Sequence, residues 1–467
     1  MSVLCELEPK AVFHYFEEIC AIPHGSGNLQ AIGDYCERFA HEHGLRVVRD
    51  EYGNVVLFKD GDKSRDPVIL QGHLDMVCVK DPDSTHDFLR DPLPIATDGK
   101  YVFSRGTTLG GDDGIAVAMI LAILADDTLH TPPIEAVFTA DEETSMLGVL
   151  GLDTSVLHGK RMLNLDSETE GSFCVSCAGG ARVIIRQPVQ TEPNTSVCTR
   201  AVLSGLVGGH SGTEIHKGHL NAIRLLTQLL VCVADVRLVS LAGGKVDNAI
   251  PDMCEAVFTG DASALRRAFD ALLAHLKQAE PNIRLTLEPA ETADSALTAQ
   301  STAAVLALVA QLPDGVQEMC ADMDNFVQTS LNLGRCRVDA SGAELHHCLR
   351  SSVDKELQEL IRSMTHRAEK HGATAEAGNA YPAWQYRADS PLRALAVEAY
   401  TRQYGAAPAV QAIHAGLECG IFAGKIQDLD CISMGPDILD IHSPQERLSV
   451  ASTERTYKLV CSILEKL

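Results

Sequence analysis

The 467-residue chain has a formal net charge of -24, which repels a phosphate backbone and argues against a nucleic-acid partner. With 45% hydrophobic residues, it is long enough to form two or three domains with real cores. The longest apolar run, residues 115–125, is too short to cross a bilayer, and residues 1–10 lack the pattern of an export signal. We therefore expect a cytoplasmic protein with no membrane contact.

The first part of the chain predicts strands that alternate with helices. Apolar residues at helical spacing cover residues 8–45, and short apolar runs predict strands at 46–49, 54–58 and 67–70. A helix over 114–125 precedes strands at 134–139 and 161–166. This order is typical of an α/β domain with a buried central sheet and helices on both faces.

The pattern changes to α+β after about residue 179. Strand-like stretches at 181–186, 197–203, 254–258 and 284–287 alternate with amphipathic helices at 220–233 and 263–278. The last segment returns to helix, strand, glycine turn and helix, with helices at 391–404 and 453–466. The sequence therefore predicts a catalytic domain of residues 1–178, an inserted α+β domain of residues 179–387, and residues 388–467 that complete the first domain.

Fifteen cysteines are scattered singly along the chain and are expected to be buried thiols. Cys174 and Cys177 form a Cys-x-x-Cys pair. A second pair is missing and the segment is strand-like, so a redox or zinc role is not favoured there.

The stretch from Leu70 to Val77 places His73 and Asp75 after an apolar strand. Residues i and i+2 of an extended chain share a face, so Asp75 can lie beside the imidazole of His73. A carboxylate on the far nitrogen is the usual partner of a metal-bound histidine. The alternative is a solvated strand end.

Acidic groups mark several further turns and strand ends. Asp112 and Asp113 lie between glycines at the start of a helix, where an N-cap and a first-turn acid are the simpler interpretation. The three consecutive acids 141–143 follow a strand and repel one another unless cations lie among them. Asp166 follows another strand, and His442 lies in a late Ile-His-Ser-Pro segment.

Together these stretches predict a two-metal hydrolase. Carboxylates and histidines are zinc ligands, and ligands of an open α/β sheet gather outside the carboxyl ends of its strands. Two metals about 4 Å apart need several such groups, one of them bridging, and a free carboxylate that takes a proton from water. The stretches described above contain enough carboxylates and histidines for such a site.

In their order along the chain, these stretches resemble the five signatures of the M20 metallopeptidases. Residues 208–216, Gly-Gly-His-Ser-Gly-Thr-Glu-Ile-His, and residues 414–420, His-Ala-Gly-Leu-Glu-Cys-Gly, are similar to the aminoacyl-histidine dipeptidase (peptidase D, Xaa-His dipeptidase) group of that family. The resemblance runs from Ile22 to the C-terminus. It implies a zinc-peptidase-like catalytic domain with a central sheet and flanking helices, plus an inserted lid or dimerisation domain.

The resemblance also implies roles by position. Five metal ligands are expected to hold two zinc ions: His73, Asp112, Glu143, Asp166 and His442. Asp112 is expected to bridge the two sites, Asp75 to orient His73, and Glu142 to be the general base and later the acid. Spacing alone does not decide whether Asp112 or Asp113 is the bridging ligand, or which of Glu142 and Glu143 is the base and which the ligand.

Four further residues are candidates for substrate binding. The resemblance assigns His210 to the oxyanion, often in the partner subunit's site, and the alternative is a turn beside a helix. Asn248 and Arg350 resemble substrate-binding positions, and an arginine fork suits a free C-terminal carboxylate. A turn residue and a surface strand residue are their respective alternatives. Glu418 could meet a substrate amine or form a structural ion pair.

The predicted function is hydrolysis of short peptides, Xaa-His dipeptides above all, by a metalloprotease that forms a homodimer. Zinc is favoured, and manganese or cobalt would also fit such ligands. Within the family, a tripeptidase, an aminoacylase or a deacetylase is the alternative. Outside it, the alternatives are a peptide-binding protein without catalysis and a protein with one structural zinc.

Overall fold

The computed structural model describes residues 2–321, 323 and 326–467 and divides into two compact units. Unit 1 contains the residues up to 176 together with residues 386–412 and 417–467. Unit 2 contains residues 177–385 and 413–416. Among the described residues, no helix has the length and apolar character needed to cross a membrane. Nine of the fifteen cysteines are buried as expected, three are partly buried, and three are exposed: Cys5, Cys78 and Cys232.

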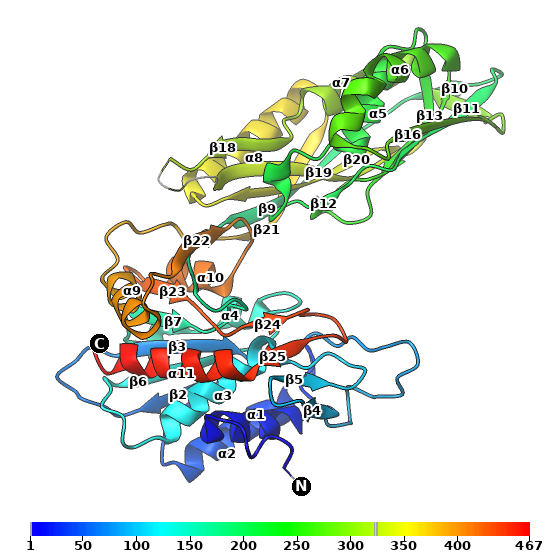
Figure 1. Ribbon diagram of the computed structural model, residues 1–467. Coiled ribbons are helices and arrows are strands. Elements are labelled where there is room, and N and C mark those ends of the chain that lie inside the picture. The colour runs from blue at the N-terminus through cyan, green and yellow to red at the C-terminus, as the bar shows by residue number, and fades with distance from the viewer. Residues whose placement is uncertain (1, 322, 324–325) are drawn as a thin grey trace. The chain divides into compact units, whose positions relative to one another are not determined.

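Unit 1 is built on an eight-stranded sheet whose centre is parallel (Figure 1). In spatial order its strands are β1 (Arg46–Arg49), β2 (Val55–Lys59), β6 (Ile134–Thr139), β3 (Val68–His73), β7 (Arg161–Asn164), β23 (Asp430–Ser433), β8 (Ser172–Cys177) and β22 (Ala409–Ile413). β6, β3, β7 and β23 run parallel to one another. All side chains of β3 and β6 are buried, as expected of central parallel strands covered on both faces. Their carboxyl ends therefore meet at one edge of the sheet.

Helices cover both faces of this sheet. The helices of unit 1 are α1 (Lys10–Cys20), α2 (Gln30–Glu42), α3 (Gly111–Ala125), α4 (Leu147–Gly151), α9 (Pro391–Tyr404), α10 (Glu418–Lys425) and α11 (Val450–Leu464), with a short 3-10 helix, η1 (Thr154–Val156). Figure 1 shows α1, α2 and α3 on one face and α4 and α10 on the other. α3 is buried from Gly111 to Leu124 and packs on β3 and α1, which fixes the helix that begins with Asp112 and Asp113.

A second, four-stranded antiparallel sheet of unit 1 joins distant parts of the chain. In spatial order its strands are β24 (Ile438–Leu439), β25 (Arg447–Ser449), β5 (Tyr101–Ser104) and β4 (Ile95–Thr97). Because β24 and β25 flank residues 440–446, this sheet holds the segment that carries His442 beside the segment that leads into α3.

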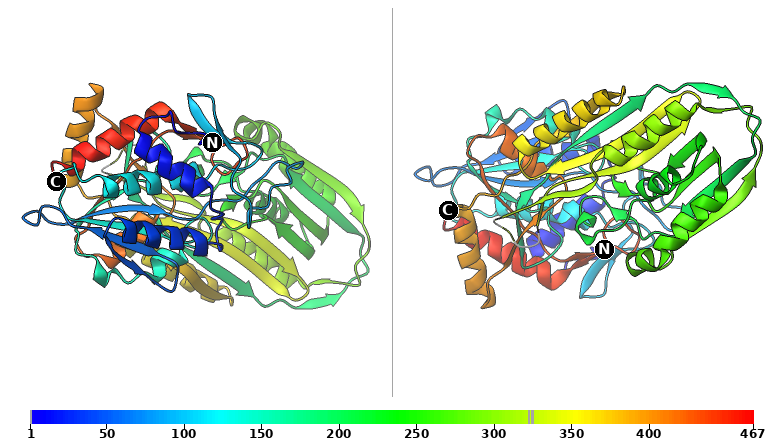
Figure 2. Two further views of the ribbon diagram at one scale, coloured as in Figure 1. Left: turned by 90° about the horizontal axis from the view of Figure 1, so that it is seen from below. Right: turned by 90° about the horizontal axis from the view of Figure 1, so that it is seen from above.

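Unit 2 is an antiparallel sheet covered on one face by helices (Figure 2). Its nine-stranded sheet has the order β16 (Arg284–Ala290), β11 (Cys198–Ser204), β15 (Cys254–Thr259), β13 (Arg237–Gly243), β19 (Val327–Asp339), β20 (Gly342–Ser351), β9 (Gly179–Gln187) and β21 (Thr374–Tyr381), with β18 (Gly315–Met319) on β19. Two-stranded pairs are β10 (Thr191–Pro193) with β17 (Ser295–Leu297), and β12 (Gly209–His210) with β14 (Ala249–Ile250). The helices are η2 (Ile215–Lys217), α5 (Ala222–Val231), α6 (Ala262–Ala279), α7 (Ala299–Gln311) and α8 (Asp354–Lys370).

The predicted α/β class is confirmed, and the predicted strands and helices lie within a few residues of those observed. The strand predicted at 67–70 continues to His73, which is the last residue of β3. The long hairpin of β19 and β20 was not predicted, because Asn332 and Gly334 interrupt its apolar pattern. The short strands β4 and β24 carry too few residues to show a period.

Candidate active site

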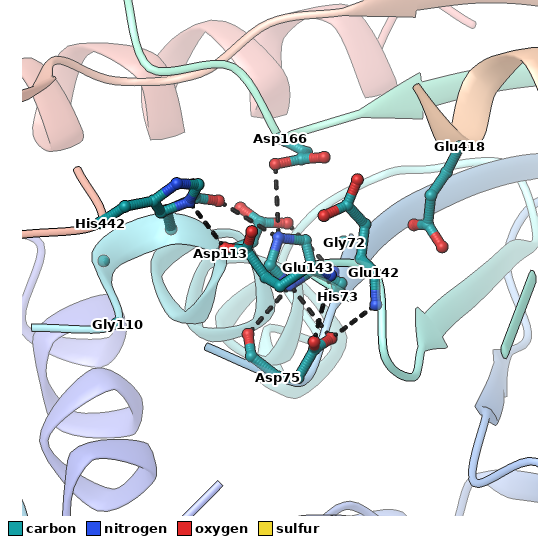
Figure 3. Close-up of polar contacts among 12 residues, drawn as sticks. Gly72, His73, Asp75, Gly110, Asp113, Glu142, Glu143, Asp166, Glu418 and His442 are labelled. Atoms are coloured by element: carbon teal, nitrogen blue, oxygen red, sulfur yellow. Dashed lines mark hydrogen bonds and ion pairs between the residues drawn. The ribbon is translucent and has the colours of Figure 1, made fainter. Parts of the chain in front are cut away.

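Three parallel strands deliver the acidic and histidine side chains to one edge of the sheet. β3 ends at His73, β6 is followed by the acids 141–143, and β7 is followed by Asp166. Figure 3 shows His73, Glu143, Asp166 and His442 directed towards one another at this edge. The convergence that the sequence predicted is therefore present.

The ring of His73 is oriented by a backbone carbonyl. Nδ1 lies 2.9 Å from the carbonyl oxygen of Asp75 and 3.5 Å from its carboxylate. Nδ1–H therefore donates to the carbonyl, which turns Nε2 towards the acids. Nε2 lies 3.2 Å from Asp112 Oδ1 and 3.6 Å from Asp166 Oδ1, so this nitrogen faces two carboxylates.

The two oxygens of Asp112 face different imidazoles. Oδ1 lies beside His73, whereas Oδ2 lies 3.2 Å from Nε2 of His442. His442 Nε2 is also 2.9 Å from Glu143 Oε1. Asp113 has a different partner: its Oδ2 accepts a hydrogen bond from the backbone N–H of His73 at 3.1 Å. The two neighbouring aspartates thus have different partners in the structure.

The carboxylate of Asp75 holds the backbone of the three-acid turn. It accepts hydrogen bonds from the N–H of Glu142 at 3.0 Å, from the N–H of Glu143 at 3.3 Å and from the hydroxyl of Ser26 at 2.7 Å. Asp75 was predicted to act on the imidazole of His73 through this carboxylate. In the structure the Asp75 carbonyl lies nearer Nδ1, at 2.9 Å, than the carboxylate does, at 3.5 Å, because Asp75 lies beyond the end of β3 and no longer alternates with His73.

Burial and mutual repulsion raise the pKa of several of these carboxyl groups. Burial, with the charges of Asp166 and Glu143, raises the pKa of Glu142 to about 8. Burial raises the pKa of Asp166 and of Asp113 well above the usual value, and the Asp166 charge adds to the rise at Asp113. Asp112 differs: burial opposes its charge, but hydrogen bonds with His442 and His73 lower its pKa. Such crowding of acids calls for cations.

The donor set fits divalent metal ions. Three groups of side chains each bring three ligand atoms within 4.8 Å of one another: His73, Asp113 and Asp166; His73, Glu142 and Glu143; and Asp112, Glu143 and His442. Within residues 2–321, 323 and 326–467, no lysine or arginine forms an ion pair with these carboxylates. Their negative charge is therefore available to metal ions of the kind that imidazole and carboxylate bind.

Glu418 is buried beneath the strand ends, at the first residue of α10. Its Oε2 accepts hydrogen bonds from Gln71 Nε2 and Thr139 Oγ1, both at 2.6 Å, and Asn164 donates in turn to Gln71. Among the residues that the structure describes, its Oε1 has no hydrogen-bond partner. Burial and the charge of Glu142 raise the pKa of Glu418 to about 8. One oxygen thus braces strands β3 and β6, and the other is free for a further hydrogen bond.

Unit 2 brings His210 and Arg350 together. The N–H groups of Gly212 and Thr213 donate to His210 Nδ1 at 3.3 and 3.1 Å, so the ring proton is on Nε2. A side chain on Gly212 would lie 3.0 Å from the His210 ring and 3.2 Å from Arg350 Nε. Arg350 is 5% exposed and donates to the Tyr381 hydroxyl at 3.1 Å, which excludes the alternative of a surface strand residue.

Asn248 lies in the same part of unit 2, before β14. Its backbone carbonyl accepts the N–H of Ser211, the residue after His210, at 2.8 Å. His414 donates to or accepts from Ser330 Oγ at 2.7 Å, and burial lowers its pKa to about 3. The ring of His414 is therefore neutral near pH 7.

Sequence reasoning missed three residues that hold this site together. Ser26, Gln71 and Glu446 each form a hydrogen bond with a predicted site residue or its backbone. Glu446 lies four residues after the predicted ligand His442, and a search for acids near the predicted ligands would have found it. Ser26 and Gln71 reach partners 49 and 347 residues away, so no local signal could have identified them.

Comparisons with known proteins identify the family of this chain. The chain is 36% identical over its whole length to 99% of the cytosol non-specific dipeptidase of Escherichia coli strain K12. The solved structure of aminoacylhistidine dipeptidase from Vibrio alginolyticus is 33% identical, with a TM-score of 0.93 over 99% of this chain and 98% of that one. Aminopeptidase PepT from Bacillus cereus shares the fold at 15% identity, with a TM-score of 0.58 over 98% of this chain and 99% of that one. Residues 69–466 match the model of peptidase family M20/M25/M40, and the chain belongs to that family.

Proposed function

We propose that this protein is a metal-dependent dipeptidase that cleaves short peptides at the site formed by the ends of β3, β6 and β7. The observation that carries the proposal is the position of Asp112, whose two oxygens face the Nε2 atoms of His73 and His442. A carboxylate between two imidazoles is what a bridging ligand of a two-metal centre requires.

Five side chains are proposed to hold the two ions. His73, Asp112 and Asp166 form one set, and Asp112, Glu143 and His442 form the other. When bound, divalent ions in such a site act as Lewis acids and lower the pKa of water towards neutrality. Zinc is the proposed metal, since two imidazoles and three carboxylates match its ligand preferences.

Glu142 is the proposed general base. Glu143 Oε1 is hydrogen-bonded to His442, whereas Glu142 contributes only its backbone N–H to Asp75, so its carboxylate is free for a proton. Burial raises its affinity for that proton. Glu142 takes a proton from the attacking water and delivers it to the departing amine. Asp75 fixes the turn that carries this base.

The residues of unit 2 are proposed to bind substrate. His210 carries its proton on Nε2, so the neutral ring can donate a hydrogen bond to an oxyanion. The buried Nε of Arg350 has no hydrogen-bond partner in the described part of the chain, which suits Arg350 to the carboxylate of a peptide. Asn248 is proposed to bind the backbone of the peptide substrate, and Glu418 its free amine. Unit 2 would act as a lid that limits peptide length, and homodimerisation remains part of this proposal.

The names of two relatives suggest a class of substrate. One is called a non-specific dipeptidase of the cytosol and another an aminoacylhistidine dipeptidase. We extend dipeptide hydrolysis and a cytosolic location to this chain, with Xaa-His dipeptides as the preferred substrates. A panel of dipeptides, tripeptides and N-acyl amino acids separates this preference from the alternatives.

The test combines metal counting with this panel. We expect about two zinc ions per chain, turnover of β-alanyl-histidine and other dipeptides, and little turnover in Glu142→Gln. Hydrolysis of N-acyl amino acids alone would move the function to an aminoacylase of the same family. Unchanged activity in Glu142→Gln would remove Glu142 as the base. Light scattering of the purified chain tests the dimer.

A further inference from the structure

Glu446 is a buried carboxylate that the mechanism above does not use. It lies just before β25, four residues after His442, and its side chain is 2% exposed. Its two oxygens accept four consecutive backbone N–H groups. Leu109 and Gly110 donate to Oε2 at 2.8 and 3.3 Å, and Gly111 and Asp112 donate to Oε1 at 2.8 and 3.4 Å.

These four N–H groups belong to the segment that shapes the start of α3. The first N–H groups of a helix have no partner within the helix, and Gly110, the N-cap residue, has no side chain to supply one. Asp112 also departs from helical geometry, with φ -82° and ψ 104°. The backbone that aims Asp112 is therefore held by a carboxylate 334 residues away.

The two glycines before the aspartates have different physical reasons. Gly110 adopts a left-handed conformation with φ +68°, which favours glycine. A Cβ on Gly111 would lie 3.1 Å from Glu446 Oε1, closer than an ordinary contact. Gly111 therefore lets the carboxylate approach the backbone.

Glu446 also joins two segments that carry proposed metal ligands. The loop from β24 to β25 carries His442, and the segment before α3 carries Asp112. His442 Nε2 and Asp112 Oδ2 are 3.2 Å apart. Glu446 lies four residues after His442 and accepts the backbone N–H of Asp112. These contacts keep the distance between the side chains of His442 and Asp112 fixed.

We propose that Glu446 is a positioning residue for the metal centre: it clamps the backbone of residues 109–112 and so sets the distance between Asp112 and His442. This inference rests on the proposed metal ligands. Glu446 touches neither substrate nor the reacting atoms. It acts through Asp112, as partners behind metal ligands do when their loss weakens metal affinity roughly 10- to 100-fold.

The test is the affinity of the full-length protein for Zn²⁺, measured by competition with a chromophoric chelator. In Glu446→Gln, either orientation of the amide turns its NH₂ towards two backbone N–H groups. We expect the affinity for Zn²⁺ to fall roughly 10- to 100-fold. Gly111→Ala, whose Cβ pushes on the same oxygen, should lower the affinity by a smaller factor and serves if Glu446→Gln does not fold.

Glu135→Gln is the matched control. Glu135 is also buried in unit 1 and accepts the backbone N–H groups of His158 and Gly159 at 2.9 Å, at the opposite end of β6 from the site. It should lower the unfolding temperature and leave zinc affinity unchanged. Wild-type affinity in folded Glu446→Gln or Gly111→Ala would overturn the inference. No zinc binding by the wild type would instead overturn the proposed metal site.

Discussion

The change Asp75→Asn tests whether the carboxylate of Asp75 positions the catalytic turn. Three donors converge on it: the hydroxyl of Ser26 and the N–H groups of Glu142 and Glu143. The two N–H groups approach different oxygens of the carboxylate, so an asparagine must turn its NH₂ towards one of them in either orientation. The substitution preserves size and removes only charge and one acceptor.

The expected magnitude follows from that geometry. A buried N–H left without an acceptor costs about 1–3 kcal/mol, and a hydrogen bond to a charged group contributes about 1.5–3 kcal/mol. If about 2–3 kcal/mol is lost from the positioning of Glu142, kcat falls roughly 30- to 150-fold, since about 1.4 kcal/mol corresponds to a factor of ten. Metal content should stay near that of the wild type, because Nδ1 of His73 is held by the Asp75 carbonyl, which the substitution retains.

The assay is dipeptide hydrolysis at saturating zinc, with kcat and KM separated and bound metal counted. Ser26→Ala is the graded control, since it removes one of the three donors to this carboxylate, worth about 1.5 kcal/mol, and should lower kcat about tenfold. Two results would refute the reasoning. One is a kcat of Asp75→Asn within threefold of the wild type. The other is a defect fully restored by excess zinc, which would assign Asp75 to the orientation of His73 alone.

Three further changes test the packing around this account. Gly72→Ala would place a Cβ 2.5 Å from Asp113 Oδ2 and should lower both zinc affinity and unfolding temperature, as titration and calorimetry would show; wild-type values would contradict the close approach. Burial, with the charges of Arg224 and His346, lowers the pKa of His347 to about 3. Below pH 6.5 the unfolded chain therefore binds a proton at His347 that the folded chain does not, and the free energy of unfolding decreases as pH falls. His347→Phe should therefore gain stability relative to the wild type between pH 6.5 and 4.5 in denaturant titrations, by at most about 1.4 kcal/mol per pH unit, and a pH-independent difference would contradict this. Asn221→Ala removes the cap of α5 and a bond to the Leu333 carbonyl, so we expect a loss of about 1–2 kcal/mol in the same titrations and no change in zinc affinity.

Much of unit 1 could be predicted from the sequence because its central strands are short apolar runs that end in polar residues. His73 and Asp166 were recognised by that pattern, and the parallel pairing of β3 with β6 and β7 brings them together as expected. The choice between Asp112 and Asp113 could not be made from spacing. It depends on backbone angles at the start of α3, which Glu446 sets from the other end of the chain.

Unit 2 was harder to predict, because its helices and strands carry mixed patterns and its contacts are distant in sequence. The proximity of His210 and Arg350 follows from Gly212, which lies against both, and no local motif encodes it. Likewise, the carbonyl of Asp75 lies nearer His73 Nδ1 than its carboxylate does, because β3 ends at His73 and the alternation does not continue to Asp75. Such details depend on where a strand ends, and a sequence pattern fixes that only to within a few residues.

The central claim is that one carboxylate, Asp112, bridges two metal ions held by His73, Asp166, Glu143 and His442. The most direct measurement is a crystal structure of the zinc-loaded protein, with anomalous data collected on both sides of the zinc absorption edge. The account predicts two anomalous peaks per chain, about 3.5–4 Å apart, with the Asp112 carboxylate between them. A single peak, or two peaks with Asp112 bound to neither or to only one, would contradict it.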